Sequence, residues 1–129
     1  MIIPSPLPDG GLAVPLRASF LVFKRLPLLG VATNNAAPRL ELFENRIELR
    51  VITRQIRRYE DLEYVDARQT LGTQNIILCW RRRFFAFAAN VGVEHLLVEL
   101  LRFFQHRGID LTERARSIAA KRLTISRTQ

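Results

Sequence analysis

The segment RLELFENRIELRV, residues 39–51, decides the fold class of this chain. Apolar and polar residues alternate on both sides of Glu44-Asn45-Arg46, which can form a turn. Alternation with a period of two is typical of a strand that buries one face, and a short polar turn between two such runs is typical of a hairpin. We therefore expect an antiparallel β-hairpin here. The residues expected to face the core are Leu40, Leu42, Ile47, Leu49 and Val51.

Further strand-like segments lie on both sides of this hairpin. The alternation changes parity between Ile52 and Ile56, which indicates a turn or a bulge near 52–54. Residues 12–25 are expected to hold a first strand, after an irregular arm over 1–11. The later segments expected as strands are QIRRY at 55–59, EYVDARQ at 63–69, IILCW at 76–80 and FFAFAA at 84–89. The segments expected as loops are 30–38 and 70–75, the second with Gly72 available for a positive φ.

An amphipathic helix is expected after the last strand, over residues 90–107. Asn90 is the expected N-cap, and the helix is expected to end at Arg107-Gly108, because a glycine is favoured just after the last helical turn. Its expected apolar stripe is Val93, Leu96, Leu97, Leu100, Leu101 and Phe104.

A second, shorter helix is expected over residues 113–123, with Thr112 as its cap. Its apolar face is thin, formed by Ala115, Ile118, Ala119 and Leu123. We expect this helix to be mobile or to pack on a partner.

Composition places the chain among globular proteins. It has 129 residues, 48% hydrophobic and 25% charged, with a formal net charge of +8. That charge calls for anionic partners to be considered, although it is spread along the chain. The single cysteine, Cys79, fits a reducing compartment and is expected to be a small buried residue. No apolar stretch is long enough to span a bilayer and no signal-peptide pattern begins the chain, so we expect a cytoplasmic protein, with a peripheral membrane role left open.

The sequence contains no recognisable catalytic or metal-binding motif. His95 and His106 would lie about 16 Å apart along a helix and cannot bind one metal. Glu60, Asp61, Glu63 and Asp66 lack the glycine and terminal glutamate of a calcium loop, so they are expected to be turn and strand surface. We expect neither an enzyme nor a cofactor, metal or small-molecule substrate.

The basic run Arg81-Arg82-Arg83 has two interpretations. It is expected to be a solvated hairpin turn between the strands at 76–80 and 84–89, and it is also a candidate anion site. Nucleic acid binding through these residues and Arg54, Arg57 and Arg58 is not expected, because strand alternation sends Arg57 and Arg58 to opposite faces and most aromatic rings hold core-like positions.

Several strands followed by one long amphipathic helix make the chain resemble the bacterial PH-like (pleckstrin-homology superfold) and GRAM-type domains. The resemblance covers residues 39–107. Its apolar signature stretch is carried by Ile56, Tyr59, Asp61, Leu62 and Val65. It implies a mainly β, α+β fold: a barrel of two roughly orthogonal antiparallel sheets, with the helix over 90–107 capping one end. The expected parts are an arm at 1–11, a PH-like domain at 12–109, and a short helix with a basic tail at 110–129.

The resemblance implies a binding module rather than an enzyme. Inositide-binding PH domains carry a lysine and then Arg-x-Arg across their first hairpin, whereas here Lys24 and Arg25 are followed only by Arg39-Leu40-Glu41. The expected function is therefore interaction or assembly, with a protein partner or a second copy of the chain. The alternative is binding of anionic lipid headgroups at the membrane. Its candidate residues are Arg81, Arg82, Arg83, Lys24 and Arg25.

Overall fold

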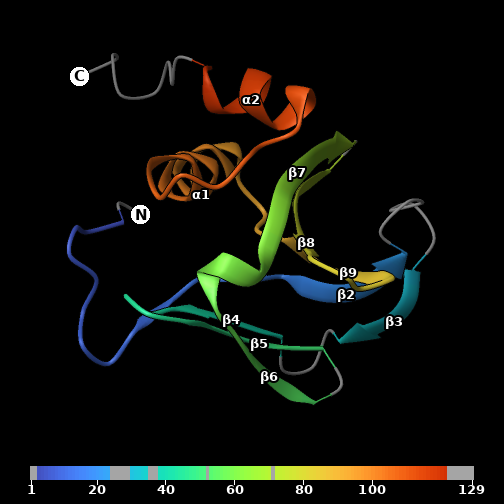
Figure 1. Cartoon of the computed structure of the whole chain (residues 1–129). Coiled ribbons are helices and arrows are strands. Elements are labelled where there is room, and N and C mark those ends of the chain that lie inside the picture. Colours follow the sequence, from blue (N-terminus) through green and yellow to red (C-terminus); the bar gives the residue numbers. More distant parts are fainter. Residues whose placement is uncertain (1–2, 24–29, 35–37, 52, 71, 122–129) are drawn as a thin grey trace.

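The protein has an α+β fold in which two antiparallel sheets are followed by two C-terminal helices (Figure 1). A computed structural model describes residues 3–23, 30–34, 38–51, 53–70 and 72–121. The strands of one sheet come mainly from the middle of the chain. Those of the other combine β2 and β3 with the three strands that precede the helices.

Nine strands, one 3₁₀ turn and two helices lie within the described ranges. The strands are β1 Leu12–Ala13, β2 Ala18–Phe23, β3 Gly30–Asn34, β4 Arg39–Leu42, β5 Ile47–Arg50, β6 Arg54–Arg57, β7 Leu62–Thr70, β8 Thr73–Trp80 and β9 Phe85–Asn90. The turn η1 is Tyr59–Asp61, and the helices are α1 Glu94–His106 and α2 Glu113–Ala119.

The two sheets have the orders β1-β4-β5-β6 and β3-β2-β9-β8-β7. The neighbours in each sheet are antiparallel. β3 and β4 are separated by only residues 35–38, yet they lie in different sheets. The chain therefore passes from one sheet to the other at this point, and both sheets contribute to the main core.

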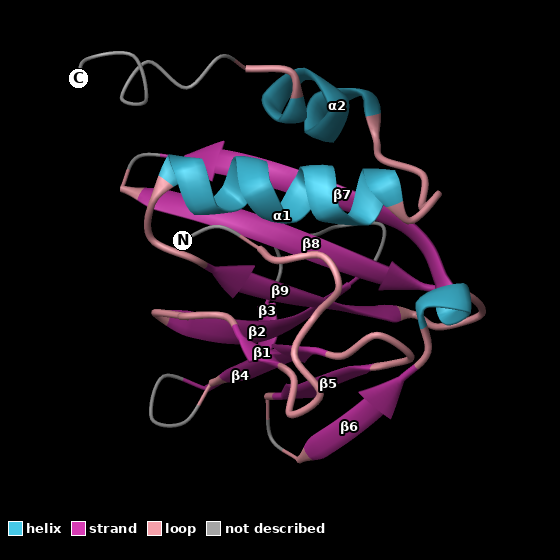
Figure 2. Ribbon diagram, turned by 90° about the vertical axis from the view of Figure 1, so that its left-hand side faces the viewer, coloured by secondary structure: helices cyan, strands magenta, loops and turns pink. Residues whose placement is uncertain are grey.

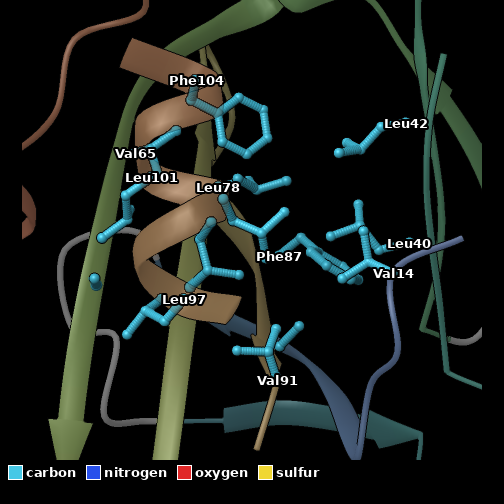
Figure 3. Close-up of a cluster of buried hydrophobic side chains, with 14 of the residues drawn as sticks. Val14, Leu40, Leu42, Val65, Leu78, Phe87, Val91, Leu97, Leu101 and Phe104 are labelled. Carbon is cyan, nitrogen blue, oxygen red and sulfur yellow. The ribbon is translucent and has the colours of Figure 1, made fainter. Parts of the chain in front are cut away.

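The main hydrophobic core lies between the two sheets and beneath α1. Figure 3 shows Leu97, Leu101 and Phe104 of α1 in one cluster with Leu78 and Phe87, with the β4 side chains Leu40 and Leu42 on the side of the core opposite to α1. The hairpin of 39–51 supplies its expected core residues, and all five are buried. This confirms the expected hairpin, because the alternating pattern matches a sheet with one buried face.

Two predicted loops are wrong in part. Residues 30–34 form β3, which pairs with β2 from Ser19↔Asn34 onward, whereas they were expected to be loop. The loop expected over 70–75 is shorter in the structure, because β7 extends to Thr70 and β8 begins at Thr73, and these two residues pair with each other. Gly72 has φ +78°, as expected. Ladder hydrogen bonds from a neighbouring strand override the weak local preference of such segments, and no local pattern reports them.

The main helix begins later than expected. Asn90 is the last residue of β9, and its side-chain oxygen accepts hydrogen bonds from the backbone N–H groups of Gln74 and Gly92 at 3.1 and 3.0 Å. Val93 is the N-cap and is exposed, so it is not part of the buried stripe. The helix end was predicted correctly: Gly108 has φ +81°, and the Ile109 N–H donates to the Phe104 carbonyl.

The second helix packs on its own chain, contrary to expectation. α2 ends at Ala119, and Ala115, Ile118 and Ala119 are buried in the main core. Thr112 caps it by accepting a 3.1 Å hydrogen bond from the Ala115 N–H, as predicted. Figure 2 shows α2 above α1 and the end of β7, and contacts with both elements hold it there. These three side chains are therefore not available to a partner, and Leu123, the fourth residue of the expected apolar face, lies outside the described residues.

Asp66 anchors this packing. It was expected on the surface, but it is buried, and its carboxylate accepts hydrogen bonds from the Thr112 hydroxyl at 2.6 Å and from Arg114 at 2.7 Å. The backbone before α2 also pairs with the outer edge of β7: the Val65 N–H donates to Asp110, and the Thr112 N–H donates to Val65. This edge of the five-stranded sheet is therefore covered at Val65.

Candidate functional site

The turn between β8 and β9 is tied to the 3₁₀ turn η1 rather than standing alone. The Arg81 backbone N–H donates to the Asp61 carbonyl at 2.8 Å, and its side-chain Nε donates to the Glu60 carbonyl at 3.2 Å. Arg82 has φ +59°, a left-handed conformation that closes the turn without a glycine. In Figure 2 this turn lies beside η1, at the end toward which β6 points.

Exposed apolar side chains gather at this turn. Five large hydrophobic residues are exposed in the part of the chain that the structure describes, and Val93 is the only one of them away from this end. The other four are Phe23, Ile56, Phe84 and Phe85. Phe84 is 86% exposed, and the rings of Phe23 and Phe85 lie 5.5 Å apart. Exposed apolar patches of this kind mark interaction sites.

Basic side chains surround the same patch. Ile56 and Trp80 line a shallow cavity together with Arg57 and the three arginines of the turn, and Asp61 is the only acidic residue in that lining. Four arginines against one aspartate leave a formal balance of +3. We call this end of the molecule the basic-aromatic tip. Its members are Phe23, Ile56, Arg57, Arg81, Arg82, Arg83, Phe84 and Phe85.

Arg57 is the least exposed cation of the tip. Its Nε is buried and has no hydrogen-bond partner among the described residues, while its terminal nitrogens donate to the Ile56 carbonyl at 3.3 Å and to Gln55 Oε1 at 3.0 Å. Burial, and then the nearby positive charge of Arg83, lower the pKa of the Arg57 guanidinium below its ordinary value. An anion placed here would relieve both effects.

The structure brings together only part of the sequence-predicted site. Arg81, Arg82 and Arg83 lie together at the tip and are exposed. Lys24 and Arg25 lie outside the described residues. Arg54 and Arg58, the other two arginines considered for a nucleic-acid groove, are paired elsewhere. Arg54 bonds the buried carboxylate of Glu48 at 2.5 Å, and Arg58 pairs with Glu60 at 3.1 Å.

Sequence reasoning missed the aromatic half of the tip. Most of the rings were expected to hold core-like positions, but β9 begins at Phe85 rather than at residue 84, and Phe84 stays outside the strand. Phe23 and Phe85 are opposite each other at the ends of their strands, beyond the reach of the core. Two phenylalanines directly after three arginines were the available signal, because one of two consecutive strand residues must leave the core face.

A larger cavity, of about 610 Å³, lies between η1 and the end of α1. Its central cation, Arg107, stacks over the Tyr59 ring at 4.0 Å and pairs with Glu44 at 3.5 Å. Burial raises the pKa of the Tyr59 hydroxyl to about 12, and that hydroxyl donates to the Phe43 carbonyl. These groups are engaged with each other, so this cavity is a weaker candidate than the tip.

Two other kinds of feature are absent from the described ranges: a metal-binding cluster and a membrane-spanning helix. No group of three or more His, Cys, Asp or Glu side chains that could hold a metal ion occurs there. The same residues include no helix that is long and apolar enough to cross a membrane. Cys79 is buried, as expected.

Comparison with protein-family models and with curated proteins gives no match for this chain. Its function is therefore inferred from the geometry of the tip.

Proposed function

We propose that this protein is a non-enzymatic binding module with a PH-like barrel. The strand topology supports the resemblance: two antiparallel sheets enclose the main core, and β3 and β4, which follow each other in the chain, lie in different sheets. α1 follows the last strand and packs against the main core, as such a barrel requires. Two features support this proposal: the order of two sheets followed by a helix, and the core that both sheets and α1 share.

The proposed ligand is an anionic lipid surface, bound through the basic-aromatic tip. One observation carries this choice: of the five large hydrophobic side chains exposed in the described residues, four lie at the same end of the molecule as four arginines. A bilayer interface offers both of the environments that this patch needs. Anionic headgroups attract guanidinium groups at about 1 kcal/mol each, and the acyl boundary accepts apolar side chains.

Nucleic acid fits the tip less well. Single-stranded nucleic acid binds through aromatic faces that stay open for base stacking. Here Phe23 and Phe85 pack on each other at an interplanar angle of 36°, which leaves Phe84 as the single projecting ring of the turn. Ile56, also exposed, offers no stacking face.

Co-sedimentation with vesicles tests the proposal directly. The protein is expected to pellet with vesicles that contain anionic phospholipid, to stay in solution with neutral vesicles, and to lose binding steeply as salt rises to about 0.15 M and beyond. A parallel titration with single-stranded oligonucleotide provides the competing outcome. Binding to the oligonucleotide without binding to anionic vesicles would overturn the proposal.

Phe84→Ser is expected to weaken vesicle binding by roughly tenfold to a hundredfold, because burying a phenylalanine side chain in an apolar phase contributes about 1.5–3 kcal/mol. Its thermal stability is expected to stay within about 0.5 kcal/mol of the parent, since the side chain is exposed. Val93→Ser is the matched control, because Val93 is also exposed but lies at the start of α1. Equal losses in both variants would show that Phe84 has no special part in binding.

Self-association through the edge of β6 is the second candidate, favoured by one observation. β6 ends the four-stranded sheet, and Ile56 on it is 53% exposed. An exposed edge strand with an apolar side chain can pair with a second copy of the same strand.

Ile56→Lys tests this candidate through the oligomeric state. A lysine on an edge strand opposes pairing, so a self-associated protein is expected to become monomeric. Vesicle binding is not the readout for this variant, because Ile56 also belongs to the tip. Sedimentation velocity over a range of protein concentrations measures the change. A parent protein that is already monomeric at high concentration would exclude this second candidate.

A further inference from the structure

Behind the tip, a second cavity of about 370 Å³ opens between the two sheets. Its inner wall is apolar and comes from both sheets: Leu49 and Val51 on one side, and Leu21, Trp80 and Phe87 on the other. α1 contributes no residue to it. The helix fills the intersheet space elsewhere, so this part of the barrel remains open.

The entrance to this cavity is positively charged. Arg57, Arg82 and Arg83 line it together with Phe84 and Phe85, and no acidic side chain does. Arg57 is the least exposed of these cations, and its buried Nε has no hydrogen-bond partner in the described part of the chain. A buried donor without an acceptor is a costly arrangement unless a ligand supplies one.

Apolar walls with a cationic entrance select an amphiphile with an anionic head. A volume of 370 Å³ is at the lower end of the range for ligand pockets, about 300–1,000 Å³, and suits one alkyl chain rather than two. A phosphate head offers several acceptor oxygens, and guanidinium groups bind such oxygens with strong, charge-assisted hydrogen bonds.

We propose that this cavity binds a single-chain phosphate amphiphile, with the alkyl chain between the sheets and the phosphate held by Arg57 and Arg83. This inference rests on the proposed lipid binding and names the ligand class at the same end of the molecule. It adds one feature that surface attachment alone does not require: a lipid monomer occupies the barrel.

Trp80 makes the proposal measurable. It is the only tryptophan of the chain, and its side chain forms part of the cavity wall. Titration with dodecyl phosphate, kept below its micelle-forming concentration, is expected to change Trp80 fluorescence in a saturable way. Inorganic phosphate and a neutral dodecyl maltoside are expected to bind at least tenfold more weakly, because each lacks one half of the ligand.

Arg57→Gln is expected to weaken dodecyl phosphate binding by about tenfold or more, through the loss of charge-assisted hydrogen bonds. Arg57→Lys, which keeps the charge, is the second variant and is expected to lose less. Arg17→Gln is the matched control, because Arg17 is exposed and precedes β2 at the end opposite to Phe23. Circular dichroism verifies that each variant is folded.

Three results would overturn the inference: equal binding of inorganic phosphate and dodecyl phosphate, an unchanged affinity in Arg57→Gln, or no response of Trp80 to dodecyl phosphate. The failure of the wider proposal has a different signature. If vesicles bind but Trp80 does not respond, the cavity site is wrong and surface attachment stands. If Trp80 responds but vesicles do not bind, the cavity site stands and surface attachment is wrong.

Discussion

Replacing Arg81, Arg82 and Arg83 together with serine is expected to lower the affinity for anionic vesicles by about a hundredfold. Each arginine near an anionic surface contributes about 1 kcal/mol, so the three together contribute about 3 kcal/mol. All three side chains are exposed, and only Arg81 forms hydrogen bonds with its neighbours among the described residues. The fold should therefore tolerate the change, with a stability loss of about 1 kcal/mol or less from the Arg81 side-chain bond.

The control for this experiment is a second triple variant with the same net charge. Arg17, Arg39 and Arg50 are exposed and lie away from the tip, so their replacement with serine removes three charges without touching the proposed site. Vesicle co-sedimentation at low and near-physiological salt compares the two variants. If both lose affinity equally, binding depends on the overall charge of +8 and not on the tip.

Asp66→Ala is expected to destabilise the fold by about 2–4 kcal/mol. The buried carboxylate accepts hydrogen bonds from Thr112, Arg114 and the Ala67 N–H, and its loss leaves these donors without their acceptor. Because Thr112 caps α2, the helix is expected to loosen first. The expected loss of stability is smaller than the largest losses seen when a fully buried ion pair is broken, because Arg114 is partly exposed and can turn toward water.

Urea unfolding of Asp66→Ala, Arg114→Ala and the double variant measures this interaction. The double-variant cycle isolates the coupling between the two side chains, expected to be about 1–3 kcal/mol. Hydrogen exchange should show faster exchange in α2 than in α1 for Asp66→Ala. Equal stability of Asp66→Ala and the parent would show that α2 is held by its apolar face alone.

The Asp66 carboxylate is also expected to make the stability of the fold depend on pH. Burial raises the pKa of Asp66, but hydrogen bonds from Arg114, Thr112 and Ala67 outweigh it, so the pKa lies below its ordinary value of 3.8. A depressed pKa stabilises the folded state above the unfolded-state pKa, and this contribution is lost as the pH falls through the folded-state pKa. The stability difference between the parent and Asp66→Ala is therefore expected to shrink below about pH 4. Urea unfolding across this range measures it, and a constant difference would contradict the assignment.

The three turn arginines of the tip could be predicted from the sequence, whereas Arg57 and the aromatic side chains could not. The three arginines form a contiguous polar run between two apolar strands, so their exposure was predictable. Arg57 was considered only as one of two arginines on opposite faces, and its place at the tip depends on β6 lying beside the β8–β9 turn. Phe23 and Phe85 resemble core residues in a linear pattern. Only their position at the ends of paired strands leaves them exposed.

The sequence by itself determined the elements whose signal is local. The period of two in residues 39–51 specifies a hairpin, and the spacing of the leucines specifies α1. Glycine specifies the turn at 72 and the end of the helix at 108, because glycine adopts a positive φ without a steric penalty. Only the tertiary structure decided the rest. β3 exists because β2 supplies its hydrogen bonds, and α2 packs on its own chain because a carboxylate 46 residues away accepts from its cap. Such contacts join residues that are distant in sequence, and their energy depends on an arrangement that no single segment encodes.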